Sequence, residues 1–342
     1  MKPPLLLATC LLAGCVHPCQ CSEIEDAALA MAEAGRVEEA AALLAEGAKL
    51  ATKPDHRDHM LFQEGLILAR AGLVEKAFAV WDPLYETTAN ENIRGRIVYE
   101  KGMLARRSGD MAEARRQFLL LVTEHPENGL ALTGLFRLEK IVMDEEGDDA
   151  VRILLEGLLE GALETTFGDD VLWELYAWHH GHGEDDKAEK YLLAIRYSYP
   201  YPTGERAYET LLALSEMMEA QERWEEALGY LEEITGPIGK APVIGSSGES
   251  GKAEAFLRMA HIYEDHLEKP GTALNLYLRV AGIPEIEDVS DDALLEAARL
   301  LVEMGKTAEA CKRIDDLLEK YPYSNKRKKA KKLAVAAGCN PG

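Results

Sequence analysis

Residues 65–118 read GLILARAGLVEKAFAVWDPLYETTANENIRGRIVYEKGMLARRSGDMAEARRQF, and this stretch contains one pattern twice. Four pairs of residues within it stand 37 positions apart: Gly65 and Gly102, Gly72 and Gly109, Ala77 and Ala114, and Trp81 and Phe118. Gly35, Ala40 and Leu44 extend the pattern by one further step toward the N-terminus. A fixed step of this length, with small and large apolar residues in register, is typical of a helical repeat array and not of a single-core enzyme.

The residue types in the pattern fit two antiparallel helices joined by a short turn. Apolar residues recur at helical spacing on both sides of Gly72. Gly72 is expected to end the first helix, because glycine adopts the left-handed conformation at the least cost. Gly65 should let the two helices approach closely, so that Trp81 fills the groove of the neighbouring helix. One hairpin cannot bury its apolar face alone, so several hairpins should stack.

The register continues along the chain at less regular steps. The alanine that follows each turn recurs five more times: Ala150, Ala188, Ala227, Ala273 and Ala310. Three prolines should close units, since a helix usually ends before a proline: Pro126, Pro200 and Pro322. The longest step contains residues 235–251, TGPIGKAPVIGSSGESG, which lack a helical period and predict a loop between helices. The register therefore predicts six units in residues 23–234 and two more in residues 252–325.

The segment from Tyr99 to Pro126 resembles a tetratricopeptide repeat, with Gly102, Gly109, Ala114 and Phe118 at the positions of that pattern. A second block fits the same pattern: Ala298, Gly305, Ala310, Ile314, Leu317 and Pro322. The resemblance covers roughly residues 23–335. It implies an all-α fold, a right-handed superhelical solenoid of about eight helical hairpins with a C-terminal capping helix.

Two units depart from the pattern. Unit four has Leu138 and Glu145 where the small residue of the first helix and the turn glycine would fall. Unit six has Glu222 at its turn. These units are expected to be distorted or merely related helical hairpins.

The resemblance also implies a working surface, because in this family the first helix of each unit lines a concave groove that contacts partner peptides. Carried onto this chain, the register predicts these groove residues: Arg70, Arg96, Tyr99, Met103, Arg106, Arg107 and Trp173. Unit two would add His59, Phe62 and Leu66. Arginine and aromatic side chains suit the anchoring of a peptide that carries a carboxylate. The set does not match the carboxylate clamp of chaperone-binding members. The alternative is that the arginines pair with neighbouring glutamates and that Tyr99 and Trp173 pack within the array.

The N-terminal segment predicts export. Lys2 precedes the apolar run 5–12, which is too short to span a bilayer of about 30 Å and fits a signal peptide. The sequence Leu12-Ala13-Gly14-Cys15 resembles a bacterial lipoprotein signal. That resemblance implies a signal peptide at residues 1–14, a lipid on Cys15 and a tether at residues 15–22. Val16 suggests the outer membrane, facing the periplasm. The alternative is an ordinary secretory signal with a coincidental cysteine.

The remaining cysteines lie at the two ends of the chain. Cys19 and Cys21 are too close in sequence for a comfortable mutual bridge. The basic segment 326–342 should form a capping helix and tail that return antiparallel onto the helix carrying Cys311. That return would bring Cys339 close to Cys311, so we predict a disulfide between them, which an exported protein can form.

The formal net charge of −22 argues against nucleic acid as a partner. Within this acidic chain, one segment near the C-terminus is strongly basic: Lys326, Arg327, Lys328, Lys329, Lys331 and Lys332. It is either a solvated helix face or a surface for an acidic partner, a glycan or a lipid head group.

The sequence contains no nucleophile elbow, no phosphate loop and no dinucleotide-binding turn, so we expect no enzyme and no cofactor beyond the covalent lipid. One cluster could hold zinc or copper: His179, His180 and His182, with nearby carboxylates. The register places it in the hairpin turn of unit five, where an exposed polar turn is favoured. The sequence thus predicts a lipid-anchored, protein-binding scaffold that organises an envelope complex. The alternatives are a solenoid that binds glycan or peptidoglycan fragments, and a metal-binding protein or enzyme at the histidine cluster.

Overall fold

The computed structural model describes residues 18–200, 204, 206–236, 247–283 and 287–339. These residues form seventeen α-helices and no strand. The chain divides into two compact units, an N-terminal unit, Met1–Val171, and a C-terminal unit, Leu172–Gly342. The predicted signal peptide and Cys15 lie outside the described residues. Among the described residues, no helix combines the length and apolar character needed to cross a bilayer.

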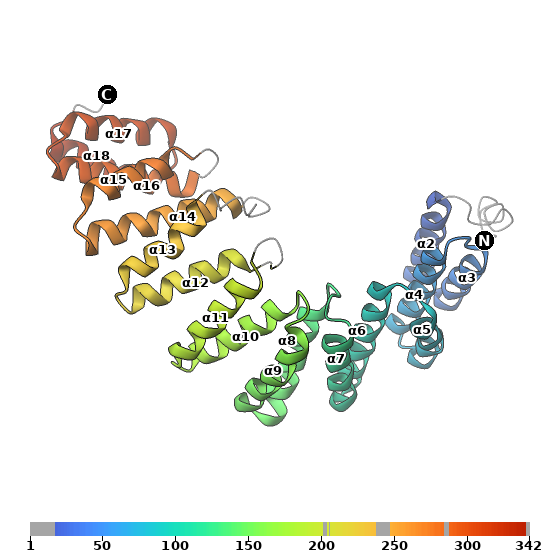
Figure 1. Ribbon diagram of the computed structural model, residues 1–342. Coiled ribbons are helices and arrows are strands. Elements are labelled where there is room, and N and C mark those ends of the chain that lie inside the picture. Colours follow the sequence, from blue (N-terminus) through green and yellow to red (C-terminus); the bar gives the residue numbers. More distant parts are fainter. Residues whose placement is uncertain (1–17, 201–203, 205, 237–246, 284–286, 340–342) are drawn as a thin grey trace. The chain divides into compact units, whose positions relative to one another are not determined.

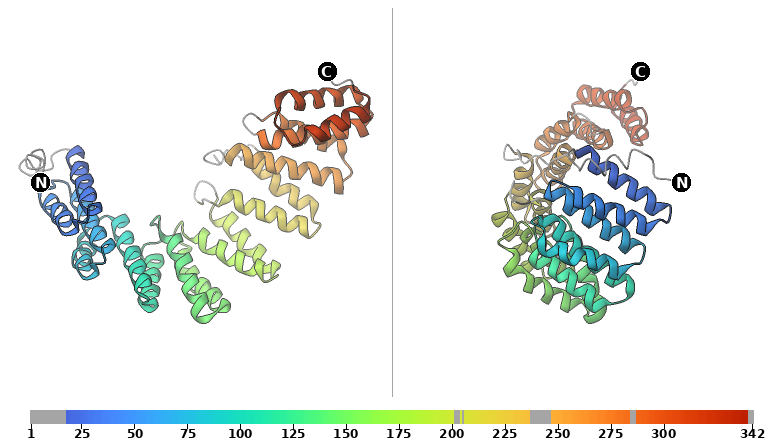
Figure 2. Two further views of the ribbon diagram at one scale, coloured as in Figure 1. Left: turned by 180° about the vertical axis from the view of Figure 1, so that it is seen from behind. Right: turned by 90° about the vertical axis from the view of Figure 1, so that its right-hand side faces the viewer.

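The N-terminal unit is a stack of four helical hairpins in sequence order (Figure 1). Their helices are α2 (Pro18–Glu33), α3 (Val37–Leu50), α4 (Pro54–Arg70), α5 (Val74–Thr87), α6 (Glu91–Ser108), α7 (Met111–Glu124), α8 (Ala131–Glu146) and α9 (Asp148–Ala162). Each helix packs on the next, and the first helices of successive hairpins, α2, α4 and α6, also touch one another (Figure 2). The predicted hairpin stack is therefore confirmed here.

The C-terminal unit continues with four hairpins and a closing helix. Its helices are α10 (Gly168–Gly181), which crosses the unit boundary, α11 (Asp185–Ser198), α12 (Ala207–Ala220), α13 (Trp224–Thr235), α14 (Ser247–His261), the π-helical turn η1 (Ile262–His266), α15 (Pro270–Ala281), α16 (Glu287–Glu303), α17 (Thr307–Lys320) and α18 (Arg327–Ala337). The all-α solenoid of eight hairpins with a capping helix is thus present in the described residues. The handedness of the superhelix stays a prediction.

The turn glycines behave as the register predicts. Gly35, Gly72 and Gly109 have φ of +78°, +79° and +85°, a conformation that costs a residue with a side chain about 1–2 kcal/mol. The prolines also act as expected, since α7 ends at Glu124, two residues before Pro126.

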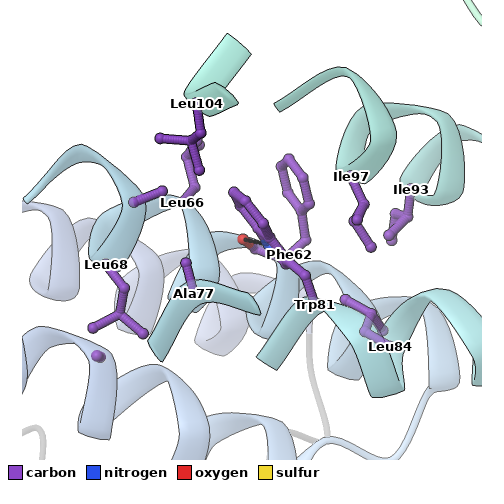
Figure 3. Close-up of a cluster of buried hydrophobic side chains, with 11 residues drawn as sticks. Phe62, Leu66, Leu68, Ala77, Trp81, Leu84, Ile93, Ile97 and Leu104 are labelled. Atoms are coloured by element: carbon purple, nitrogen blue, oxygen red, sulfur yellow. Dashed lines mark hydrogen bonds between the residues drawn. The ribbon is translucent and has the colours of Figure 1, made fainter. Parts of the chain in front are cut away.

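The two helices of the second hairpin approach closely at Gly65, next to the core cluster that contains Phe62 and Trp81 (Figure 3). A Cβ at Gly65 would lie 2.2 Å from Nε1 of Trp81, so only glycine fits beneath the indole ring. The Trp81 side chain is fully buried, and its Nε1 donates a hydrogen bond of 3.1 Å to the carbonyl oxygen of Phe62. Ile93 and Ile97 of α6 complete this core, so it joins two hairpins.

Polar side chains tie the turns between hairpins to the start of a preceding helix. Thr88 donates from Oγ1 to Oδ2 of the buried Asp58 at 2.7 Å. One unit later, Nδ2 of Asn128 donates to the carbonyl oxygen of Asn92 at 3.1 Å. In the last hairpin, Ser324 bonds to Asp291. Each contact gives a buried or half-buried polar group a partner and fixes the stagger between hairpins.

Two predicted boundaries are wrong. Residues 247–251, assigned to the Gly/Ser/Pro loop 235–251, begin α14 instead. Gly251 lets α14 pack closely against α12, because a Cβ at that position would lie 2.7 Å from Cε2 of Tyr208 on α12. Burial raises the pKa of the Tyr208 hydroxyl, which donates to Glu254. The tether predicted at residues 15–22 is also too long, since α2 begins at Pro18, and proline suits the first turn of a helix.

The two irregular units are complete hairpins with adjusted turns. In unit four the turn falls at Gly147, with φ of +90°, two residues after Glu145, and Leu138 is buried. In unit six Glu222 itself adopts φ of +58°, in place of the expected glycine.

The C-terminal cap has the predicted arrangement. Helix α18 packs against α17 and α16 through the buried Ala330 and Ala334. A disulfide joins Cys311 of α17 to Cys339, with the two Cα atoms 5.5 Å apart.

Candidate partner-binding face on helices α4 and α6

Helix α6 carries most of the predicted groove residues. Its start is fixed by Asn90, whose side-chain oxygen accepts a hydrogen bond from the backbone N–H of Ile93 at 3.2 Å. Its end is fixed by the left-handed Gly109. Between them, residues three or four positions apart lie on one face of the helix: Arg96, Tyr99, Met103, Arg106 and Arg107. Arg70 is the last residue of the adjacent helix α4. We call these six residues the α4–α6 face.

Arg96 joins the two helices. Its Cζ atom lies 4.4 Å from the centroid of the Phe62 ring on α4, a cation–π contact. Phe62 is fully buried beneath it, and Leu66 is buried in the same core. The prediction that Phe62 and Leu66 face a partner is therefore wrong, because these side chains fill the contact between hairpins.

The other members of the face differ in exposure. Tyr99 is half-buried and packs on Phe118 of α7, with the ring centroids 5.9 Å apart. Met103 is half-buried, whereas Arg70, Arg106 and Arg107 are exposed. The face thus combines a partly packed aromatic and thioether strip with cations at both ends. Positive charge near a helix C-terminus is also favourable for the helix itself, by roughly 0.3–1 kcal/mol.

A pocket of about 390 Å³ adjoins Arg96. Its lining residues are Asp55, His56, His59, Asn90, Asn92, Ile93 and Arg96. His59 Nε2 lies 3.5 Å from a carboxylate oxygen of Glu25 on α2. Lys53 is the N-cap residue of α4, and Asp55 lies in the first turn of that helix. The asparagines of this pocket were not predicted, although Asn90 before a helical segment is a capping signal.

The arginines of the α4–α6 face have no ion-pair partner among the described residues. Two arginines on first helices of hairpins in the C-terminal unit do have partners. Arg258 of α14 donates to Glu219 at 3.1 Å and bonds to Glu216 of α12. Arg299 of α16 bonds to Glu264 of η1 and donates to Glu296 and Glu303 of its own helix at 2.7 and 2.9 Å.

Arg258 and Arg299 stand at the register positions of Tyr99 and Met103, not at those of the arginines on the α4–α6 face. Arg258 and Tyr99 stand at the same distance before the register alanines of their units, Ala273 and Ala114. Glu216 corresponds in the same way to Met103, because each lies eleven residues before the alanine of its unit. In the C-terminal unit these positions are therefore occupied by ion pairs between helices. The alternative prediction was that the arginines of the α4–α6 face pair with neighbouring glutamates. The described residues contain no such pair. The cations of this face remain available to a partner.

Trp173 belongs to the C-terminal unit and is half-buried. The Cζ atom of Arg206 lies 5.1 Å from the centroid of its ring, and Tyr176 contacts its edge at 5.0 Å between centroids. The ring of Trp173 is thus covered in part by its own chain, in keeping with the packed alternative.

The three histidines at the end of α10 do not converge, since His179 and His180 lie in the last turn of the helix and His182 follows it. His179 is buried, not exposed as the favoured prediction had it, and its Nδ1 lies 2.6 Å from a carboxylate oxygen of Glu184. His180 stacks on Tyr176 and bonds to Asp185, whereas His182 stacks on Trp178. Hydrogen bonds from Lys187 and then His179 lower the pKa of Glu184. In the described part of the chain, no group of three or more histidine, cysteine or acidic residues could hold a metal ion.

The four tryptophan rings each contact another side chain. Trp81 is buried, and the rings of Trp178 and Trp224 are stacked on His182 and His266 at 3.8 and 3.7 Å between centroids. With Trp173 beneath Arg206, each tryptophan already contacts a side chain of its own unit.

Comparisons with known proteins agree with the repeat register. Residues 292–324 match the tetratricopeptide repeat family. No curated protein sequence matches the chain.

Several solved structures are similar in fold. BtubC from P. vanneervenii is 16% identical with a TM-score of 0.46, covering 69% of this chain and 93% of that chain. The C-terminal part of a TPR repeat-containing protein from Cytophaga hutchinsonii is 14% identical with a TM-score of 0.47, covering 79% and 98%. PilW, described as a type IV pilus biogenesis factor, is 16% identical with a TM-score of 0.39, covering 69% and 97%. Similarities at this level carry no information on partner or activity.

Proposed function

We propose that this chain is a non-catalytic scaffold that binds a protein partner through the α4–α6 face. The partner segment would be acidic or would end in a free carboxylate. Arg96, whose Cζ lies over the Phe62 ring, would donate to a carboxylate beside the pocket, and Arg106 and Arg107 would contact further acidic residues. Tyr99 and Met103 would supply the apolar contact between them.

One observation carries this proposal. In a chain with 60 acidic and 38 basic residues, Arg258 and Arg299 of the C-terminal unit form ion pairs between helices at the positions equivalent to Tyr99 and Met103, and the arginines of the α4–α6 face form none with the described residues. Leaving four arginines without carboxylate partners in so acidic a chain favours a negatively charged ligand from outside it.

The proposal includes the site of action. A lipid on Cys15 would anchor the chain in the outer membrane, facing the periplasm, where it would help assemble or organise an envelope complex. This part is supported by the sequence Leu12-Ala13-Gly14-Cys15. It requires no nucleic acid partner and no cofactor other than the lipid. Metabolic labelling with an alkyne-tagged palmitate tests it, since label should enter the wild-type chain and be lost in Cys15→Ser. Equal labelling of both would overturn the anchor.

Site-specific photo-crosslinking in the native cell tests the binding face. A photoreactive amino acid at Met103 should give one dominant adduct with a partner, identified by mass spectrometry. The same amino acid at Arg116, on the exposed side of α7, is the matched control. Adducts of equal yield at both positions, or none at Met103, would contradict the proposed face.

A further inference from the structure

The basic helix α18 has one face that no described residue of its unit covers. Its buried residues, Ala330 and Ala334, pack on α17 and α16. At 100° per residue, the opposite arc of the helix carries four exposed lysines and one exposed valine: Lys328, Lys329, Lys331, Lys332 and Val335. We call this arc the α18 face.

The basic residues of this segment divide into two groups. Lys326 pairs with Asp292 of α16, and Arg327 donates to the carbonyl oxygens of Leu318 and Tyr321 at the end of α17. These two residues dock the helix. The four lysines of the α18 face have no ion-pair partner among the described residues. No acidic residue follows Glu319 in the sequence, so the chain provides none nearby along this helix.

The placement of these lysines works against the helix that carries them. The first turn of a helix has the positive end of the helix dipole, which favours acidic residues, yet the first turn of α18 contains none. Residues that break a local rule without a gain in the fold indicate a functional constraint. A polar cap for a solenoid would be satisfied equally well by glutamates, which are the commoner choice in this chain.

Two apolar groups accompany the charge. Tyr323, in the turn just before α18, is 99% exposed, and Val335 is 75% exposed. Tyrosine is enriched where protein meets the interface of a membrane, because its ring is apolar and its hydroxyl is polar. An exposed tyrosine just before α18 and an exposed valine on the α18 face fit a surface that is negatively charged on the outside and apolar beneath.

We infer that the α18 face is a docking surface for a membrane that contains anionic phospholipids. The lysines would contact the phosphate groups, each contributing near the surface, while Tyr323 and Val335 reach the interfacial layer. The four lysines point outward in different directions around the helix axis. Such an arrangement suits lipid head groups, because these can move laterally to contact each cation. A protein partner would need a fixed and matching set of acidic residues. The inference is independent of the α4–α6 face.

Vesicle binding by the full chain tests this inference. Every variant carries Cys15→Ser, so that no acyl chain contributes. The test variant combines Lys328→Gln, Lys329→Gln, Lys331→Gln and Lys332→Gln. The control combines Lys53→Gln, Lys190→Gln, Lys306→Gln and Lys312→Gln, which changes the net charge equally at other exposed lysines. Co-sedimentation is measured with vesicles of phosphatidylcholine alone and with added phosphatidylglycerol.

The parent chain and the control should bind the anionic vesicles and bind the neutral ones less. The test variant should bind the anionic vesicles at least about 100-fold more weakly, since four lysines are removed from the surface. Added salt should weaken the binding of the parent chain. Circular dichroism should show the test variant to be folded and no less stable, because its substitutions remove charge that opposes the helix dipole.

Equal binding of the test variant and the control to anionic vesicles would overturn the inference. So would a parent chain that dimerises in sedimentation velocity while the test variant stays monomeric with unchanged vesicle binding. In that case the α18 face would be an interface between two copies of the chain.

Discussion

At the scale of single residues, the repeat depends on positions where only one size of side chain fits. Trp81 fills the space that Gly65 leaves, and its indole N–H bonds to the backbone of the opposite helix. The pair therefore fixes both the distance and the rotation of two helices. Overpacking at such a point is costly because the buried ring has no free volume into which it can move.

Gly65→Ala should lower the free energy of unfolding by about 1–3 kcal/mol, since the new methyl group displaces the Trp81 ring. Gly157→Ala, in the exposed middle of α9 with no atom within 4 Å of the new Cβ, is the matched control. That substitution should stabilise the protein by roughly 0.5–1 kcal/mol, because alanine is the better helix former. Urea denaturation followed by circular dichroism measures both. A neutral Gly65→Ala would contradict the packing described for Trp81.

Glu222 is strained at a turn where Gly35, Gly72 and Gly109 occupy the equivalent positions of other units. Glu222→Gly should raise the free energy of unfolding by about 1 kcal/mol, because the left-handed conformation at φ of +58° penalises a side chain. Gly109→Ala should have the opposite effect of similar size, since Gly109 has φ of +85° and open space around it. Thermal denaturation of the two variants checks the pair. Destabilisation by Glu222→Gly would show that its side chain contributes more than the strain costs.

At the scale of the helical element, α18 is held to the solenoid by small buried residues and one disulfide. Ala330 and Ala334 bury little apolar surface, so the covalent link to Cys311 has a large share in keeping the helix docked. A loop that joins residues 28 positions apart restricts the unfolded chain strongly.

Cys339→Ser should therefore free α18 before the rest of the C-terminal unit unfolds. The chain-entropy estimate gives a loss of about 3–4 kcal/mol for a loop of this length. Hydrogen exchange should show faster exchange in α18 and unchanged protection in α12 and α13. Exchange in α18 that is the same with and without the disulfide would contradict this account.

The sequence predicted elements well where one residue type is physically required. The left-handed turns at Gly72 and Gly109 and the close contact at Gly65 each demand glycine, so spacing alone located them. It failed at Gly251, because a glycine needed for close packing against Tyr208 looks identical to a glycine in a loop. The hydrogen bond between Thr88 and Asp58 was not predictable, since it joins residues thirty positions apart and depends on the stagger of the hairpins.

The candidate site was predicted only in part. The register placed Arg96, Tyr99, Met103 and Arg106 on one helix face, which the structure has. It could not tell that Phe62 and Leu66 at equivalent positions would be buried, because packing between hairpins decides their exposure. Nor could it tell which arginines would be paired, since Arg258 and Arg299 have partners on neighbouring helices that only folding brings close.

At the scale of the whole molecule, charge is distributed unevenly over an acidic chain. Many cations form ion pairs among the described residues, whereas the arginines of the α4–α6 face and the lysines of the α18 face form none there. The two sets differ in chemistry, since arginine over an aromatic ring suits a fixed carboxylate, whereas exposed lysines suit a diffuse anionic surface. One molecule could thus hold a protein partner and contact a membrane through separate surfaces.

The measurement that tests the central proposal most directly is partner affinity after charge reversal on the α4–α6 face. The double variant Arg96→Glu/Arg106→Glu should bind the partner identified by crosslinking at Met103 at least about 100-fold more weakly, because two charge-assisted contacts become repulsive. Arg115→Glu/Arg116→Glu, the same charge change on α7, should leave the affinity within about threefold of the parent chain, since exposed ion pairs there contribute little. Equal affinity of the parent chain and the α4–α6 variant, with both folded, would contradict the account.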